Sequence, residues 1–134
     1  MKYIGKIGEF LVLSELLKRD IEAYQAIKSN QESYDISVIL SRNNVARLQV
    51  KTTELNNKST NNSIGNIDKE YDFLVIVVLS EHVKFYILSK SQALTEKGKN
   101  VKLSITTKNG NSFSVTKNLL CYENCWSTLI NYGG

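Results

Sequence analysis

Two neighbouring segments with alternating apolar residues constrain the fold of this chain most strongly. Residues 34–41 and 45–53 are rich in Ile, Val, Leu and Thr, and their apolar side chains recur at every second position, which predicts two β-strands. The polar cluster Arg42-Asn43-Asn44 between them predicts a turn, and therefore a hairpin. The apolar rows are Tyr34, Ile36, Val38 and Leu40 in the first strand and Ala46, Leu48 and Val50 in the second.

The alternation also predicts the register of the hairpin. Both apolar rows must face one core, because a slip of one residue would turn a whole row to water. This condition puts Asp35, Gln49 and Lys51 together on the opposite face. A two-residue turn at Asn43-Asn44 would pair Asp35 with Thr52 and break the match. We therefore expect a loop of three or five residues, or a bulge.

An acid, an amide and a lysine on one sheet face have two interpretations. The first is an ordinary polar face with a charge pair near solvent. The second is a site for metal-assisted phosphodiester hydrolysis. In such a site a carboxylate holds a hard cation, and a lysine orients water or stabilises phosphate charge.

The composition is that of one globular domain. A chain of 134 residues can bury one sizeable core, and 42% hydrophobic with 22% charged residues is ordinary for a soluble protein. The apolar run 73–79 is too short to span a bilayer, and no signal peptide follows the first residues. With two cysteines and no secretory signal, we expect a cytoplasmic setting. The net charge of +4 is compatible with a polyanionic partner.

Residues 3–18 have the apolar spacing of a helix. Gly5 and Gly8 weaken its first turns, which suggests that another part of the chain approaches the backbone closely there. Glu9 lies in the apolar row of this helix. A buried carboxylate is costly unless it is paired or bound to a metal. The alternative is that Glu9 lies at a frayed helix start, where it caps the helix or reaches solvent.

The polar stretch 54–68 predicts a long loop that follows Lys51 directly, and such loops are often functional. We expect it to be mobile and to border the Lys51 site.

The remaining patterns predict strands over 21–28, 71–80 and 83–88, a helix over 89–97 between Ser89 and Gly98, a hairpin of 101–107 with 113–115 around Asn109-Gly110, and a closing helix over 118–132.

Cysteine and histidine chemistry has little support. Cys121 and Cys125 are four residues apart, and we expect them to be core thiols on one face of the closing helix. Zinc would need further Cys or His ligands, and His82 is the only histidine. A single histidine also removes most Ser-His and Cys-His nucleophile schemes.

The order of the polar residues resembles that of the PD-(D/E)XK nuclease superfamily. The matching positions are Gly8-Glu9 in the opening helix, Asp35 at the start of a strand, and Gln49-Val50-Lys51 on the next strand. The resemblance covers residues 3–88 and is closest to the small branch of Holliday-junction-resolvase-like proteins and QxK homing endonucleases of group I introns. It implies an α/β, restriction-endonuclease-like core with a mixed central sheet, an N-terminal helix and flanking helices. Residues 101–132 would add a C-terminal hairpin and helix to this single domain, 1–134.

The resemblance also implies a set of functional residues. Glu9, Asp35, Gln49 and the backbone carbonyl of Val50 would bind Mg²⁺ or Mn²⁺, and Lys51 would assist water activation. Gln49 stands where the superfamily has an acid, but an amide oxygen is still a hard donor. We expect Lys6, Arg47 and Lys58 to contact the nucleic acid.

The function expected from this resemblance is Mg²⁺-dependent endonucleolytic cleavage of DNA. So small a nuclease would need two copies to cut both strands, so a homodimer or higher homo-oligomer is the expected assembly. The main alternative is a catalytically inactive module on the nuclease fold that binds nucleic acid or a partner protein. An RNA-binding protein is a third class, but the aromatic stacking pattern expected on a sheet face is missing.

Overall fold

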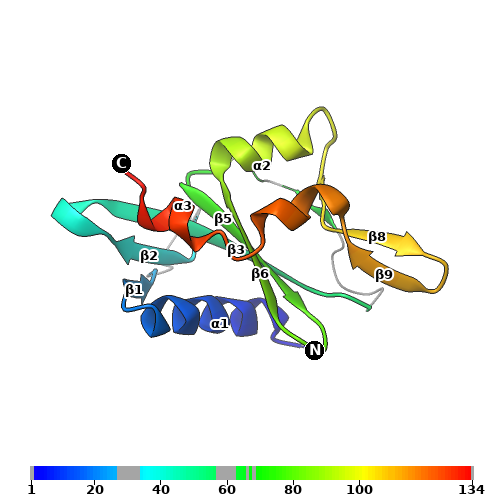
Figure 1. Ribbon diagram of the computed structural model, residues 1–134, viewed down its shortest axis with the longest axis horizontal. Coiled ribbons are helices and arrows are strands. Elements are labelled where there is room, and N and C mark those ends of the chain that lie inside the picture. The colour runs from blue at the N-terminus through cyan, green and yellow to red at the C-terminus, as the bar shows by residue number, and fades with distance from the viewer. Residues whose placement is uncertain (1, 27–33, 57–62, 66, 68, 134) are drawn as a thin grey trace.

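The computed structural model describes residues 2–26, 34–56, 63–65, 67 and 69–133. Its centre is a five-stranded sheet in the order β1–β2–β3–β5–β6 (Figure 1). Strands β3 and β5 run parallel, whereas the β1–β2, β2–β3 and β5–β6 pairs are antiparallel. The predicted α/β class with a mixed central sheet is confirmed. The strands of this sheet are β1 (Glu22–Gln25), β2 (Ile36–Ile39), β3 (Val45–Glu54), β5 (Phe73–Leu79) and β6 (Lys84–Ser89).

The β2–β3 hairpin has the register that the alternation predicts. Ile36 lies opposite Leu48, and the last strand pair joins Ile39 to Val45 across a five-residue loop. Within this loop the 3₁₀ turn Ser41–Asn43 ends with Asn43 at a φ of 64°, the left-handed conformation that closes such hairpins. The even registration keeps the apolar residues of both strands on one face.

The first sheet face packs against two helices. Helix α1 (Ile4–Lys18) lies along the sheet, as predicted, and α3 (Trp126–Ile130) packs on the same sheet face (Figure 1). Both helices bury side chains in one cluster with the even-numbered residues of β3 and the odd-numbered residues of β5. Its largest contributors from the helices and β5 are Val12, Leu16, Phe73, Val75, Val77, Trp126 and Leu129.

The second sheet face carries a separate core under helix α2 (Lys90–Lys97). The even-numbered residues of β5 (Leu74, Ile76 and Val78) pack here with Ala93 of α2, Leu103 and Leu119. Because successive strand residues point to opposite faces, β5 needs an unbroken apolar sequence, which confirms the interpretation of residues 73–79 as a strand covered on both sides. Two short strand pairs lie outside the central sheet: β4 (Ser63–Ile64) with β7 (Leu103–Ser104), and β8 (Thr106–Asn109) with β9 (Ser112–Val115).

Local signals at α2 and the last hairpin are confirmed. The Ser89 hydroxyl accepts from the Gln92 backbone N–H, and the Gln92 side chain accepts from the Ser89 N–H, so the two residues form a capping box. Gly98 ends the helix at a φ of 58°, and Gly110 lies at a φ of 64° in the β8–β9 turn. Both positions require a conformation that glycine adopts most easily.

The prediction of one closing helix over 118–132 is wrong. The segment forms a 3₁₀ helix, η2 (Lys117–Tyr122), and the short α3, with a break between them. At the break Asn124 has a φ of 55°, its backbone N–H donates to Phe85 O at 2.8 Å, and Glu123 bridges to Tyr86. The chain leaves the helical path here because its backbone pairs with strand β6.

This break also changes the position of the two cysteines. Cys121 is exposed on η2, and Cys125 is only partly buried beside the first core. Both are free thiols. The prediction of two core thiols on one helix face is therefore wrong.

Two predictions near the central hairpin also need correction. Tyr34 packs against the second core rather than with Ile36 and Val38, because β2 begins only at Ile36 and the strand alternation does not include Tyr34. The stretch 54–68 is not a plain loop in its described part, since Ile64 pairs with Leu103 and both Ile64 and Ile67 are buried. These two isoleucines anchor the otherwise polar stretch by packing into the second core. Its residues 57–62, 66 and 68, and residues 27 and 28 of the predicted first strand, lie outside the described residues.

Among the described residues, no helix is long and apolar enough to cross a membrane.

Candidate nuclease site

Asp35 directly precedes β2, and its side chain contacts strand β3. Its backbone N–H donates to Leu48 O at 2.7 Å, and its Oδ2 atom accepts from the Val50 N–H at 2.7 Å. The carboxylate thus takes the place that a strand carbonyl would fill one step further along the ladder. Asp35 is only 6% exposed, and charge-assisted hydrogen bonds of this kind stabilise a buried carboxylate.

Gln49 contacts the same carboxylate oxygen. Its Nε2 atom donates to Asp35 Oδ2 at 3.0 Å. A carboxylate accepts and does not donate, so this contact orients the amide, with the nitrogen toward Asp35 and Oε1 away from it. Within the described part of the chain, Gln49 Oε1 is buried and has no hydrogen-bond partner. A buried carbonyl oxygen without a donor is costly, and it indicates a place for a bound group.

Lys51 follows two residues after Gln49 and is half-buried. In a strand, side chains two residues apart lie on the same face, so Gln49 and Lys51 point away from the face of Leu48 and Val50. Across the parallel β3–β5 pair, Gln49 lies opposite Leu74 and Lys51 opposite Ile76, both of the second core. The predicted shared face of Gln49 and Lys51 is confirmed, and the hydrogen bond brings Asp35 to Gln49.

Glu9 is buried on α1, with 8% exposure. Its Oε1 atom lies 3.5 Å from Gln25 Nε2 and 3.4 Å from Lys6 Nζ. Gln25 ends β1, and the next residue, Ala26, donates its N–H to Asp35 O at 2.9 Å. Glu9 is therefore directed at the end of β1 next to the strand that carries Asp35. The close convergence of Glu9 and Lys51 with the Asp35–Gln49 pair stays a prediction.

Gln25 is a polar partner that the sequence interpretation did not single out. A signal for it was present, because Gln25 occupies a position of the alternating row where the strand pattern calls for an apolar side chain. It is paired in register with Ile36, which places it one residue from Asp35.

Arg47 is already paired within the chain. Its guanidinium Nε lies 3.3 Å from Asp72 Oδ2, its backbone N–H donates to the same oxygen at 2.8 Å, and Tyr132 Oη donates to Asp72 Oδ1 at 3.1 Å. Burial opposes ionisation of Asp72, but the hydrogen bonds from Arg47 and Tyr132 and the charge of Arg47 together outweigh it and lower the pKa of that carboxyl. A phosphate would have to compete with Asp72, and DNA contact by Arg47 stays a prediction.

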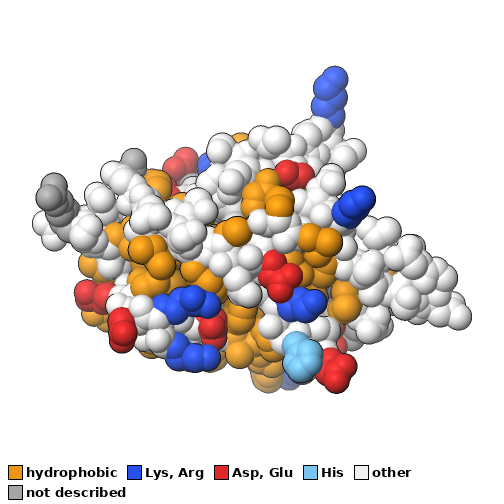
Figure 2. Space-filling model, in the orientation of Figure 1, with side chains coloured by type: hydrophobic (Ala, Val, Ile, Leu, Met, Phe, Trp, Pro, Cys, Tyr) orange, Lys and Arg blue, Asp and Glu red, His pale blue; other side chains and the backbone are white. Residues whose placement is uncertain are grey.

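The other two candidate DNA contacts also stay predictions. Lys6 contacts Glu9 but remains substantially exposed, and Lys58 lies outside the described residues. On the face shown in Figure 2, lysines and arginines are interleaved with acidic side chains rather than gathered in one patch.

The donor set suits a hard cation with few protein ligands. Among the described residues, no group of three or more His, Cys, Asp and Glu side chains could hold a metal ion. The candidate ligands are the two carboxylates of Glu9 and Asp35 and the side-chain amide of Gln49. Oxygen atoms from Asp35, Gln49 and Glu9 are the ligand type that Mg²⁺ and Mn²⁺ prefer.

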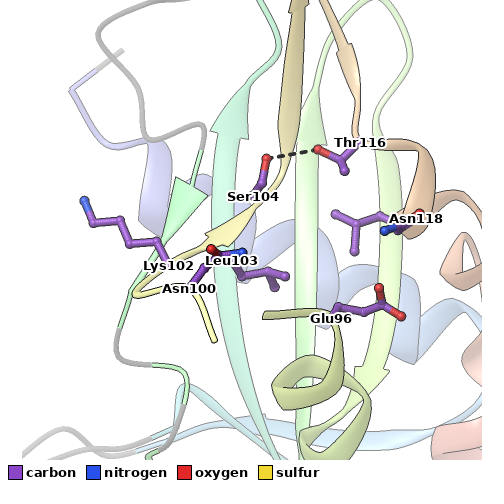
Figure 3. Close-up of a pocket in the computed structure, with 8 residues that line it drawn as sticks. Glu96, Asn100, Lys102, Leu103, Ser104, Thr116 and Asn118 are labelled. Carbon is purple, nitrogen blue, oxygen red and sulfur yellow. Dashed lines mark hydrogen bonds between the residues drawn. The ribbon is translucent and has the colours of Figure 1, made fainter. Parts of the chain in front are cut away.

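A small polar cavity lies elsewhere in the molecule. Its volume is about 170 Å³, and residues of α2, β7 and η2 line it (Figure 3). The hydroxyls of Ser104 and Thr116, two of its lining residues, are hydrogen-bonded at 3.2 Å. The Glu96 carboxylate at its wall accepts from Tyr122 Oη, and this bond raises the pKa of Tyr122 to about 12. None of the candidate nuclease residues lines this cavity.

In sequence, the chain matches no protein-family model and no curated protein. In structure, it is similar to a bacterial homing endonuclease, I-Ssp6803I, with a TM-score of 0.68 and 16% sequence identity. The similarity covers 97% of this chain and 93% of that one. At this identity the likeness shows the fold, so the chain has a nuclease-like α/β fold over nearly its whole length.

Proposed function

We propose that this protein is a metal-dependent endonuclease that hydrolyses DNA phosphodiester bonds, on the PD-(D/E)XK plan. The observation that carries the proposal is the Asp35–Gln49 pair at 3.0 Å, with Gln49 Oε1 buried and without a donor among the described residues. The nuclease-like fold of a homing endonuclease supports it independently.

The residues at this site fit a Mg²⁺ or Mn²⁺ ion. Gln49 Oε1 and the carboxylates of Asp35 and Glu9 would hold it, together with the Val50 carbonyl. When bound, such an ion neutralises phosphate charge and lowers the pKa of a coordinated water. Asp35 keeps its orientation through the Val50 N–H, and Gln49 keeps its orientation through Asp35, so both ligands are held by the sheet itself.

Lys51 would act on the substrate side of the site. Its side chain lies on the same strand face as Gln49, where the ammonium group would orient the attacking water and stabilise the charge that develops on the phosphate. Leu74 and Ile76 of the second core lie opposite Gln49 and Lys51 in the sheet, and apolar surroundings of this kind would strengthen both interactions.

The test is cleavage of supercoiled plasmid DNA in Mg²⁺ and in Mn²⁺. Wild-type protein is expected to convert it to nicked or linear DNA, and chelation of the metal should stop the reaction. Lys51→Ala is expected to slow single-turnover cleavage by about 100-fold or more, equivalent to about 2.7 kcal/mol of barrier. A purified Lys51→Ala protein that cuts as fast as wild type would show that a contaminant or another site is responsible.

One observation favours a second candidate, a non-catalytic module that binds nucleic acid or a partner protein. Asp35 Oδ2 already satisfies the Val50 N–H, so the carboxylate also has a purely structural use. No cleavage of supercoiled, linear or branched DNA with either metal would favour this candidate. Cleavage of both strands would require two copies of the chain, and sedimentation of the protein with and without DNA would test for such an assembly.

A further inference from the structure

Helix α1 lies very close to strand β3 at Gly8. A Cβ atom added at Gly8 would lie 1.7 Å from Thr52 Oγ1, 2.9 Å from Thr52 Cβ and 3.0 Å from Thr52 Cγ2. Only glycine fits here without moving the helix or the strand. Gly5, in the same helix, has nothing within 4 Å of its added Cβ, so the predicted close approach exists at Gly8 and not at Gly5.

The partner in this contact is stiff. Thr52 is β-branched, which restricts its side-chain rotation, and it lies in the middle of the sheet on a ten-residue strand. Its Oγ1 atom is buried with no hydrogen-bond partner in the described ranges, so the Thr52 side chain contributes here by packing against the Gly8 backbone. The contact therefore sets the distance between α1 and β3.

The Gly8–Thr52 contact lies next to the candidate site residues in the sequence. Thr52 directly follows Lys51 and is two residues from Val50, whose N–H binds Asp35. Gly8 directly precedes Glu9. The Glu9 carboxylate contacts Gln25 Nε2 at 3.5 Å and Lys6 Nζ at 3.4 Å.

We infer that Gly8 and Thr52 are positioning residues, which hold α1 close enough to β3 for the Glu9 carboxylate to reach a cation held by Asp35 and Gln49. A methyl group at Gly8 would have to move from 1.7 Å to an ordinary contact beyond 3.4 Å, and the helix that carries Glu9 would move with it. A misplacement of about 1 Å in a catalytic group can cost about 100-fold in rate. The inference rests on the proposed function.

The experiment uses a graded series at the contact. Gly8→Ala introduces the overlap with all three Thr52 side-chain atoms. Adding Thr52→Ala leaves only the contact with the Cβ atom of residue 52 at 2.9 Å, and adding Thr52→Gly instead removes this contact too. Gly5→Ala is the matched control in the same helix, and the two Thr52 single variants are controls for the strand. Urea unfolding measures the stability of each variant, and calorimetric titration with Mg²⁺ measures the affinity of its folded form.

We expect Gly8→Ala to weaken Mg²⁺ binding by about tenfold or more. The double variant with Thr52→Ala should recover part of the Mg²⁺ affinity. The double variant with Thr52→Gly should bind Mg²⁺ with an affinity within about threefold of that of Thr52→Gly alone. Gly5→Ala should bind Mg²⁺ as wild type does. A folded Gly8→Ala protein that binds Mg²⁺ normally would overturn the inference and leave Gly8 with a packing role only. If Gly8→Ala alone does not fold, equal affinities of the two double variants would overturn it.

The same titration separates this inference from the proposed function. A wild-type protein that binds neither Mg²⁺ nor Mn²⁺ overturns both. A wild-type protein that binds Mg²⁺, with an affinity that does not follow the Gly8–Thr52 overlap, overturns the positioning role alone.

Discussion

The side-chain amide of Gln49 donates to the carboxylate of Asp35 at 3.0 Å and leaves its own oxygen buried. This pair joins the residue directly before β2 to the middle of β3 and gives Asp35 two uses. The carboxylate satisfies a strand N–H in the folded protein, and it offers negative charge next to a carbonyl oxygen that has no donor within the described residues. The first prediction separates these two uses.

Asp35→Asn should keep the fold and remove the cation site. The Asn Oδ1 atom can still accept from the Val50 N–H and from Gln49, so we expect the free energy of unfolding to change by less than about 1 kcal/mol. Asp35→Ala leaves that N–H buried without an acceptor and should cost about 1–3 kcal/mol. Urea unfolding and Mg²⁺ titration measure the two effects. Normal Mg²⁺ affinity in Asp35→Asn would contradict the proposed site.

Gln49→Glu should bind Mg²⁺ more tightly yet cleave DNA more slowly. A third carboxylate adds an oxygen ligand and a charge, but the added charge repels the scissile phosphate. Like-charge juxtaposition costs several kcal/mol at a desolvated site, enough to lower the rate by about 100-fold or more. Calorimetry alongside single-turnover cleavage measures both quantities. If neither changes, Gln49 is not a ligand, and Glu9 and Asp35 are the only side chains that hold the metal.

The Asp72–Arg47 pair should give the protein a carboxyl-dependent loss of stability in acid. The pKa of Asp72 is lowered in the folded protein, so its stabilising effect is complete above the pKa of the unfolded carboxyl, about 3.9. It is lost as the pH falls below that value and through the lower folded pKa. We expect Asp72→Asn to cost about 1–2 kcal/mol at pH 7 and to lose less stability than wild type between pH 5 and pH 2. Urea unfolding at a series of pH values measures this, and parallel curves for the two proteins would contradict it.

Lys6→Ala should weaken DNA binding and reduce its dependence on salt. If Lys6 contacts one phosphate, the slope of log affinity against log salt concentration should fall by about 0.9. Lys18→Ala is the matched control, because Lys18 is also on α1 and is exposed beside Glu15. Fluorescence anisotropy with duplex DNA at several salt concentrations measures the slopes. Equal slopes for the two variants would remove Lys6 from the DNA interface.

Local patterns were sufficient for much of the fold. The β2–β3 register followed from matching Ile36 and Val38 with Ala46 and Leu48, because a slip of one residue exposes a whole row. The unbroken apolar run of β5 predicted cover on both faces, and Ser89 with Gly98 marked the ends of α2. These features depend on neighbours in the sequence, and sequence spacing reports them directly.

The failed predictions share one physical cause. The helix pattern over 118–132 was interrupted because Asn124 donates to Phe85 of β6, which is remote in sequence. Ile64 and Ile67 were buried in a segment that composition marks as a loop because they lie over the second core. In each case a tertiary contact outweighed a local preference.

The sequence by itself determined that Gln49 and Lys51 share one face of their strand, opposite to the apolar row of Ala46, Leu48 and Val50, because side chains alternate along a strand. Only the tertiary structure decided which atoms meet. The Asp35 carboxylate takes two donors from β3, Gln25 reaches Glu9 from another strand, and Arg47 pairs with Asp72 from a third segment. The distance between α1 and β3 was likewise decided by the contact of Gly8 with Thr52, because only packing in three dimensions makes a missing Cβ atom necessary.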